Sequence, residues 1–284
     1  MAKKLKITNH SRDSAGMTYI YPVVSRRAGG VSVGINLNPN NACNWRCIYC
    51  QVPNLKRGAA PKIDLPKLES ELRTFLYELL YSDFMLQHVP AEARRINDIA
   101  LSGNGEPTSA KEFEQVILII KQVRRSFTSL PNDLKLVLIT NGSLINRPYV
   151  QAGLIQMAQQ NGEVWFKLDS ATREGRQRIN STQMSLRQAR ENLKLTAALC
   201  PTWLQTCIFQ INNNPPSEKE VDAYLNFVHD LLQQGVPLKG VLLYGIARSS
   251  MQPEAAQLSK VSEKWLHNFS VKINTLGLLT KISL

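Results

Sequence analysis

The chain has 284 residues, a formal net charge of +12, and 43% hydrophobic and 20% charged residues. This composition excludes collagen-like, mucin-like and wholly disordered proteins, and the length allows one α/β barrel or two smaller domains. No run approaches the roughly 18 apolar residues that cross a bilayer, so we expect a cytoplasmic protein with no membrane association.

Most of the positive charge lies near the start of the chain. Residues 1–60 carry nine Lys and Arg residues against a single Asp. A basic segment of this kind suggests an anionic partner such as RNA. A solubilising surface explains the charge equally well. We expect residues 1–32 to form a basic N-terminal extension, partly irregular, before the folded core.

Six apolar, β-branched segments alternate with longer segments of helical period along the chain. This pattern is typical of strands separated by helices. The predicted strands are 33–37, 98–101, 134–140, 164–168, 204–211 and 240–244. Six strand–helix repeats predict a parallel sheet with helices outside, either as an open doubly wound sheet or as a partial barrel.

Two of the helices between these strands have recognisable start signals. Ser109 with Glu112, and Ser217 with Glu220, form S-x-x-E capping boxes, in which the two side chains bond to free amides at the helix start. Gly235 is the expected end of the second helix. An apolar stripe predicts a helix nearer the start of the chain. Its members are Leu68, Leu72, Phe75, Leu76 and Leu79.

Strand polarity favours the barrel over the doubly wound sheet. A doubly wound sheet is apolar on both faces, whereas the fourth strand and its continuation place Lys167 and Asp169 on one face and apolar residues on the other. In the fifth strand, Cys207 lies on the face predicted to pack against helices. Polar groups at several carboxyl strand ends predict a lumen that holds a ligand. We expect residues 33–250 to form the barrel and 251–284 a C-terminal helical segment packed on it.

The sequence Cys43-Asn-Trp-Arg-Cys47-Ile-Tyr-Cys50 directly follows the first predicted strand. A C-x3-C-x2-C loop places three thiolates close enough to hold three corners of a 4Fe-4S cube, for which four cysteines are usual. The fourth iron then lacks a protein thiolate and is open to a substrate or cofactor. The other two cysteines, Cys200 and Cys207, are expected to be structural.

A zinc site is the alternative interpretation of the cysteine loop. Zinc needs a fourth ligand, usually His or Cys at short spacing. The nearest histidines along the chain, His10 and His88, lie well outside that spacing. The odd number of cysteines also argues against a secreted disulfide framework. A structural zinc site therefore has little support.

With an aromatic residue, Tyr49, before its last cysteine, the loop resembles the signature of the radical S-adenosylmethionine (SAM) superfamily. The resemblance implies an α/β fold, a partial TIM barrel (β/α)6 with parallel strands, which agrees with the predicted repeats. It also implies that Cys43, Cys47 and Cys50 ligate a 4Fe-4S cluster, whose open iron chelates the methionyl amino and carboxylate groups of SAM. Tyr49 would pack beside the adenine.

The second predicted strand runs into Ser102-Gly-Asn-Gly-Glu-Pro-Thr108. This stretch resembles the G-G-E motif of the superfamily, whose backbone contacts the methionyl amino group, with Asn104 in place of the second glycine. A glycine-rich turn suits this role because its carbonyls can approach a ligand closely. An ordinary strand-to-helix turn is the alternative.

Other strand ends resemble further SAM-contacting positions. Together with Tyr49, the residues assigned to SAM on this resemblance are Gly103, Asn104, Gly105, Glu106, Thr140, Asn141, Asp169 and Asn212. Tyr244 and Arg248 are weaker candidates, for SAM or substrate. Alternatively, Asn141 begins a plain turn, and Lys167 with Asp169 forms only an ion pair in the lumen.

The implied activity is reductive cleavage of SAM by the cluster. This reaction gives methionine and a 5′-deoxyadenosyl radical, which abstracts hydrogen from a substrate. A reductant such as flavodoxin or ferredoxin is the implied partner. The cofactors supply this chemistry, and the protein positions SAM and excludes water.

The stretch from Tyr21 to Cys50 resembles bacterial radical SAM proteins grouped with the tRNA wyosine-base synthases. With the basic leading segment, this makes a tRNA or RNA base the leading substrate hypothesis. Those synthases use a second cysteine-bound cluster, which Cys200 and Cys207 alone do not supply, so we do not expect the wyosine precursor as product. The alternatives are a peptide or small-metabolite substrate, and a non-enzymatic iron–sulfur redox sensor or RNA-binding protein.

Overall fold

The computed structural model describes residues 16–25 and 29–283. Much of the predicted basic extension, residues 1–15 and 26–28, lies outside the described residues. In the described ranges, no helix combines the length and the apolar character needed to span a membrane.

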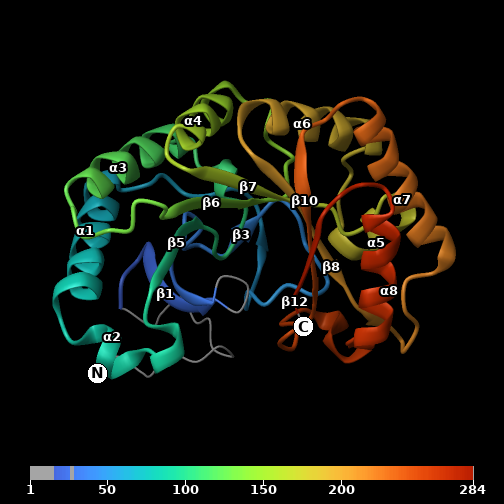
Figure 1. The fold of residues 1–284 in the computed structure, drawn as a ribbon, viewed down its shortest axis with the longest axis horizontal. Helices are drawn as coiled ribbons and strands as arrows, with labels where there is room; N and C mark the ends of the chain where they lie inside the picture. The colour runs from blue at the N-terminus through green and yellow to red at the C-terminus, as the bar shows by residue number, and fades with distance from the viewer. Residues whose placement is uncertain (1–15, 26–28, 284) are drawn as a thin grey trace.

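A curved sheet of eight strands forms the centre of the molecule, in the order β1-β2-β5-β6-β7-β8-β10-β12 (Figure 1). Its strands are β1 (Ile20–Ser25), β2 (Gly30–Ile35), β5 (Ile96–Leu101), β6 (Lys135–Thr140), β7 (Gly162–Lys167), β8 (Thr202–Ile208), β10 (Leu238–Gly245) and β12 (Thr280–Ser283). The pairs from β2 to β12 are all parallel, and β1 is antiparallel to β2. Among the described strands β1 and β12 are the two edges, so the barrel is partial.

Helices form an arc on the outer side of the sheet (Figure 1). They are α1 (Leu65–Tyr81), α2 (Phe84–His88), α3 (Phe113–Arg125), α4 (Pro148–Ala158), α5 (Arg173–Asn180), α6 (Leu186–Leu199), α7 (Glu218–Gln233) and α8 (Glu263–Asn274). Short 3-10 turns are η1 (Ala91–Ala93), η2 (Pro107–Ser109) and η3 (Pro253–Gln257). Two-residue strands pair outside the main sheet: β3 (Ala42–Cys43) with β4 (Lys56–Arg57), and β9 (Gln210–Ile211) with β11 (Leu258–Ser259).

The predicted partial barrel is confirmed, with each of the six predicted strands present in the sheet. The sheet also contains two strands that are not among those predicted. Edge strand β1 lies within the predicted N-terminal extension, and it contains Pro22, which an edge position tolerates because its missing N–H breaks no ladder on the open side. Strand β12 lies within the segment predicted to be helical, after α8.

The helix signals have mixed outcomes. The stripe of α1 is confirmed, because Leu68 and its partners are buried in the core between the helices and the sheet. Ser217 caps α7, and Gly235 follows that helix with a φ of 70°. The box at Ser109 is wrong: α3 begins at Phe113, and Ser109 lies in η2, where its hydroxyl donates to the carbonyl of Glu106.

Tyr21 of β1 covers Gly34 of β2 across the edge of the sheet. The two residues are directly paired, and a Cβ on Gly34 would lie 2.3 Å from the Tyr21 ring. The ring is held in place, because its hydroxyl is 2.8 Å from Oγ of Ser102 at the end of β5. Gly34 thus permits close aromatic packing, because a strand glycine allows its neighbour to approach the backbone.

We expect Gly34→Ala to lower the free energy of unfolding by about 1–3 kcal/mol, because the new methyl group must displace the Tyr21 ring. Gly245→Ala is the matched control, since its nearest atoms lie at 3.9 Å and the methyl group meets no clash. Urea denaturation monitored by circular dichroism measures both. Equal midpoints for the two variants would contradict the packing argument.

Candidate functional site

A cavity of about 300 Å³ lies at the carboxyl ends of the parallel strands and extends into the lumen. It gathers residues that are distant in the sequence. Of the predicted site residues it is lined by Cys43, Cys47, Tyr49, Cys50, Gly103, Asn104, Gly105, Glu106 and Asn141. Deeper in the lumen it is lined by Ser32, Asp98, Trp165, Lys167 and Gln205. The cysteine loop and the glycine-rich turn thus face one space.

The three cysteines of the loop are free and partly exposed. Burial raises the pKa of Cys43 to about 12 and the pKa of Cys47 to about 11. In the protein alone these two side chains are therefore neutral thiols at pH 7. A bound metal ion deprotonates a coordinating thiol, so three free thiols on one cavity are a suitable donor set for iron.

A single metal ion and a 4Fe-4S cluster require different arrangements of their ligands. Within the described ranges, no three His, Cys, Asp or Glu side chains are grouped so as to hold one metal ion. A 4Fe-4S cluster makes a different demand, because each cysteine binds a different iron atom.

The glycine-rich turn after β5 is pressed against the start of the cysteine loop. Gly103 has a φ of 147°, and a Cβ there would lie 2.4 Å from Oδ1 of Asn36. A Cβ on Gly105 would lie 2.0 Å from the carbonyl oxygen of Ala42. Only glycine fits at these two positions. The glycines therefore set the distance between the turn and Cys43, which follows Ala42.

Asn104, which stands where the family motif has glycine, carries an unsatisfied acceptor. Its Nδ2 donates to Oδ1 of Asn41 at 2.7 Å, whereas its Oδ1 is buried without a partner in the described structure. A buried polar atom without a hydrogen bond is costly. Because Asn104 lines the cavity, a ligand amino group is a chemically suitable donor for this oxygen.

Glu106 is buried, and both oxygens of its carboxylate accept hydrogen bonds from neighbouring residues of the protein. Its Oε1 accepts from Thr108 Oγ1 at 2.7 Å and Thr140 Oγ1 at 2.6 Å, and its Oε2 accepts from the backbone N–H of Asn141 at 2.7 Å. Burial raises the pKa of Glu106, and these hydrogen bonds oppose the shift. Glu106 and Thr140 thus tie the end of β5 to the end of β6.

Asp169, after β7, is the centre of a second buried network. Its Oδ2 accepts from the hydroxyl of Tyr49 and from Nδ2 of Asn180 at 2.7 Å, and its Oδ1 accepts from the N–H of Cys207 at 3.0 Å. The Tyr49 ring also packs on Phe209, with centroids 5.3 Å apart. Asp169 does not line the cavity itself, but it fixes Tyr49, which does.

Lys167 and Cys207 both line the lumen. The side chain of Lys167 lies 4.9 Å from the Tyr49 ring centroid and 3.4 Å from the hydroxyl of Tyr244. The alternative of an ion pair with Asp169 is wrong, because no such pair is found between these two described residues. The prediction that Cys207 packs against helices is also wrong. The residue next to it, Ile208, packs in the helix-side core instead.

Asn212 does not join the site. Strand β8 ends at Ile208, and the chain turns into β9, which pairs with β11 away from the main sheet. Asn212 is exposed there, with a φ of 53° and its N–H bonded to the carbonyl of Gln257. Asn212 is a turn residue because the chain leaves the barrel before reaching it. The weaker candidates Tyr244 and Arg248 do line the cavity.

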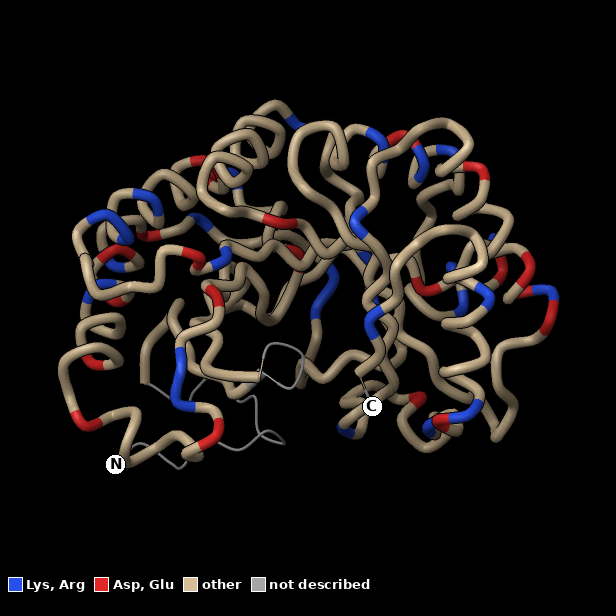
Figure 2. Tube along the Cα trace, viewed as in Figure 1, with Lys and Arg blue, Asp and Glu red and all other residues tan. Residues whose placement is uncertain are grey.

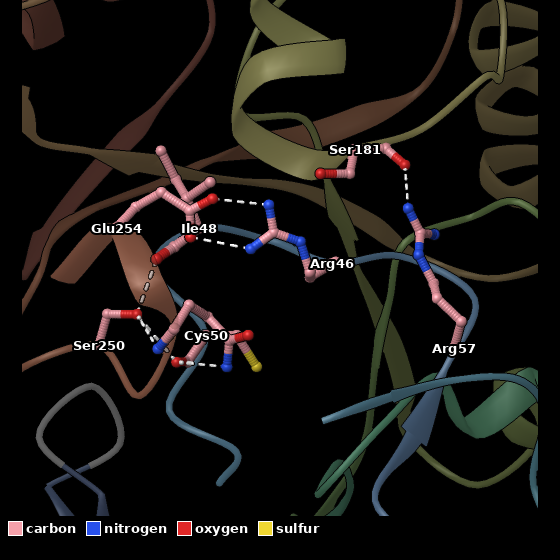
Figure 3. A network of polar contacts seen from close by, with 8 residues as sticks. Arg46, Ile48, Cys50, Arg57, Ser181, Ser250 and Glu254 are labelled. Atoms are coloured by element: carbon pink, nitrogen blue, oxygen red, sulfur yellow. Dashed lines mark hydrogen bonds and ion pairs between the residues drawn. The ribbon is translucent and has the colours of Figure 1, made fainter. Parts of the chain in front are cut away.

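The segment after β10 clamps the cysteine loop (Figure 3). Arg46 forms a bidentate ion pair with Glu254, at 2.8 and 2.6 Å. The hydroxyl of Ser250 donates to the carbonyl of Ile48 at 2.7 Å and lies 3.1 Å from that of Cys50. Sequence reasoning missed this clamp, because the partners lie about 200 residues apart and no local pattern joins them.

The end of α5 holds the loop from another side. The N–H of Arg46 donates to the carbonyl of Asn180 at 3.2 Å, and the N–H of Ile48 donates to that of Ile179 at 2.8 Å. Arg57 donates to the carbonyl of Asn44 and, at 2.5 Å, to the carbonyl of Ser181. Figure 3 shows the contact with Ser181. The cysteine loop is therefore fixed by two segments that the sequence analysis did not assign to the site.

Comparison with known proteins gives a family match over most of the chain. Residues 37–221 match the Radical SAM superfamily. Among curated proteins, the chain is 31% identical over 137 residues to "GTPase Obg" of Brachyspira hyodysenteriae. That match covers 47% of this chain but only 17% of the relative, so the chain spans much less than two thirds of that protein's length.

Two solved structures resemble the whole fold. The structure of TYW1 with a lysine–pyruvate adduct has a TM-score of 0.57 at 12% identity, covering 88% of this chain and 74% of that one. A radical SAM methyltransferase from Sphaerobacter thermophilus has a TM-score of 0.58 at 9% identity, covering 89% and 66%. At these identities the likeness shows the fold alone.

We expect Glu106→Gln to lower the free energy of unfolding by about 1–3 kcal/mol, because in either orientation the amide NH₂ group faces a backbone N–H, that of Thr108 or that of Asn141. Exposed Glu191 gives the matched control, and Glu191→Gln is expected to change the stability by less than about 0.5 kcal/mol. Chemical denaturation measures both. If Glu106→Gln unfolds with the wild-type midpoint, the carboxylate does not tie the two strand ends together.

Proposed function

The chain belongs to the radical SAM superfamily, and on this premise we propose that Cys43, Cys47 and Cys50 ligate its 4Fe-4S cluster beside a SAM-binding cavity. The chain is an enzyme of a superfamily that uses this cluster together with SAM. The observation that carries the proposal is a single cavity lined by three free cysteines and by the polar ends of several parallel strands.

When bound, the cofactors would supply the chemistry: an electron from an external donor such as flavodoxin or ferredoxin would break the bond between the sulfonium and C5′ of SAM, which would lead to hydrogen abstraction from the substrate. The protein supplies positions for these groups. The clamp from Ser250 to Glu254 keeps the loop in place, so that the three thiols face the cavity together.

We assign the methionyl end of SAM to the glycine-rich turn. The unsatisfied Oδ1 of Asn104 accepts from the amino group, and Gly103 and Gly105 allow the backbone to approach it. We assign the adenine end to the side of the cavity where Tyr49 lies, held by Asp169. Glu106 and Thr140 position the two strand ends.

Lys167 contributes a fixed positive charge to the lumen. Burial lowers its pKa, but the neighbouring Tyr244 and Asp169 outweigh this effect and raise the pKa of Lys167 well above its usual value. The side chain is therefore a cation throughout the physiological range. We assign it to an anionic group of SAM or of the substrate.

An RNA base is the substrate class that we propose. Two exposed cations, Lys56 and Lys62, lie within seven residues after Leu55, which lines the cavity. Cations at this edge suit a phosphate backbone, and enzymes that act on a base turn its nucleotide out of the stack into a pocket. Figure 2 shows Lys and Arg interspersed with Asp and Glu along the outer helices, so the helices in that view carry mixed charge. A peptide or small metabolite is the competing substrate class.

We expect anaerobically reconstituted protein to form 5′-deoxyadenosine from SAM when dithionite is added, and we expect Cys43→Ser, Cys47→Ser and Cys50→Ser to reduce this to background. Cys200→Ser is the control, because Cys200 is buried at the end of α6 and does not line the cavity. Liquid chromatography of the nucleoside product and an iron assay measure the outcome. Full activity in the loop variants would overturn the ligand assignment.

We expect the double variant Lys56→Glu, Lys62→Glu to bind tRNA about tenfold more weakly at low salt, because two phosphate contacts are replaced by repulsion. The matched control is Lys219→Glu, Lys264→Glu, which makes the same charge change at exposed positions on α7 and α8. Filter binding measures both. If both double variants bind tRNA equally weakly, only the net charge of the protein matters for binding. A separate test is the set of modified nucleosides in tRNA from a deletion strain. An unchanged set would favour a substrate other than RNA.

A further inference from the structure

The side chain of Asn180 donates a hydrogen bond to a cysteine of the loop. Asn180 is the last residue of α5 and is buried. Its Nδ2 lies 3.2 Å from Sγ of Cys47 and 2.7 Å from Oδ2 of Asp169. Both partners are acceptors, so only the orientation with the NH₂ group toward them satisfies the site. Each of the two amide hydrogens therefore has its own acceptor.

The backbone on both sides of this contact prevents it from opening. The residues before and after Cys47, Arg46 and Ile48, donate their N–H groups to the carbonyls of Asn180 and Ile179. The chain then turns sharply at Ser181, which has a φ of 48° and accepts from Arg57. Figure 3 shows this side of the loop, with Arg57 reaching Ser181 and Arg46 reaching the clamp.

We propose that Asn180 sets the reduction potential of the cluster through its N–H···S hydrogen bond to Cys47. The inference rests on the proposed ligation of the cluster by Cys47. A reduced cluster carries one more negative charge than the oxidised one, so a donor to a ligating sulfur stabilises the reduced form more. Hydrogen bonds to the sulfurs are among the determinants of iron–sulfur potentials. Asn180 is thus a positioning residue for electron entry.

The second hydrogen of Asn180 connects this effect to the ligand side of the cavity. It bonds to Asp169, whose other partners are the hydroxyl of Tyr49 and the N–H of Cys207. Three donors spread the negative charge of Asp169, which would otherwise face the sulfur of Cys47. Loss of Asn180 therefore removes a donor from the sulfur and leaves the nearby carboxylate less well compensated, and both changes lower the potential.

The test is a redox titration of reconstituted protein, without SAM, monitored by the EPR signal of the reduced cluster. Asn180→Ala is expected to shift the midpoint potential to more negative values. Asn180→Asp is expected to shift it further, because a carboxylate takes the place of the donor. Iron and sulfide content, measured on each sample, shows whether the variants hold the same cluster.

The matched control is Arg57→Lys, which keeps the charge but breaks the bridge between Asn44 and Ser181. It loosens the same junction without touching a sulfur, and its potential is expected to equal that of the wild type. An equal shift in Arg57→Lys would show that loop displacement, and not the hydrogen bond, determines the potential. Wild-type potentials in both Asn180 variants would also overturn the proposal.

A measurement on the wild type covers the case in which the variants do not fold. Resonance Raman bands of the iron–cysteine bonds are expected to shift between H₂O and D₂O by more than the weak N–H contact of Trp45 with Cys43 at 3.5 Å accounts for, because the amide hydrogens of Asn180 exchange. An absence of any shift would contradict the hydrogen bond. If the wild-type protein takes up no cluster, the proposed function fails and this inference with it. A normal cluster with unchanged potentials contradicts this inference alone.

Discussion

The functional site depends on contacts that fix the conformation of the long loop that carries the three cysteines. Between the end of β2 and the start of α1, the chain forms no regular structure beyond the two-residue pair of β3 with β4. Such a loop has little stability of its own, and ordering it costs backbone entropy. Fixed contacts from the end of α5 and from the Ser250–Glu254 clamp offset that cost. Because these contacts are mainly to backbone carbonyls, they fix the path of the loop rather than any one side chain.

Two buried carboxylates organise the strand ends around this loop. Glu106 links β5 to β6, and Asp169 links β7 to Tyr49, Asn180 and β8. A buried carboxylate is stable only when donors surround it, and here protein donors occupy both oxygens of each. Both carboxylates are therefore hydrogen-bonded within the protein, whereas the side-chain amide of Asn104 keeps a free acceptor for a ligand. A residue type that suggests ligand binding in a sequence can thus serve to position its neighbours.

The sequence correctly predicted which way side chains face where one face of a helix or strand is polar and the other apolar. The alternation in β7 correctly placed Lys167 in the lumen, and the stripe of α1 gave its buried face. The predicted strand 204–211 runs past the end of β8 at Ile208, so the residues beyond that point do not report on the faces of β8, and Cys207 was placed on the wrong face. Edge strands β1 and β12 both lie outside the predicted strand–helix repeats, and β12 has only four residues. They form because the sheet offers unpaired edges, which is a property of the assembled barrel and not of their own residues.

Part of the positive charge near the start of the chain is used in contacts within the protein. Arg46 and Arg57 lie in that basic region, yet the first is paired with Glu254 and the second bonds to two carbonyls. Their charge is used to hold the cysteine loop, and no counting of charges along the sequence separates them from Lys56 or Lys62. The distinction comes from partners far along the chain, at Ser181 and Glu254. Net charge therefore overstates the cationic surface available to an anionic substrate, and only the residues left exposed beside the cavity support an RNA substrate.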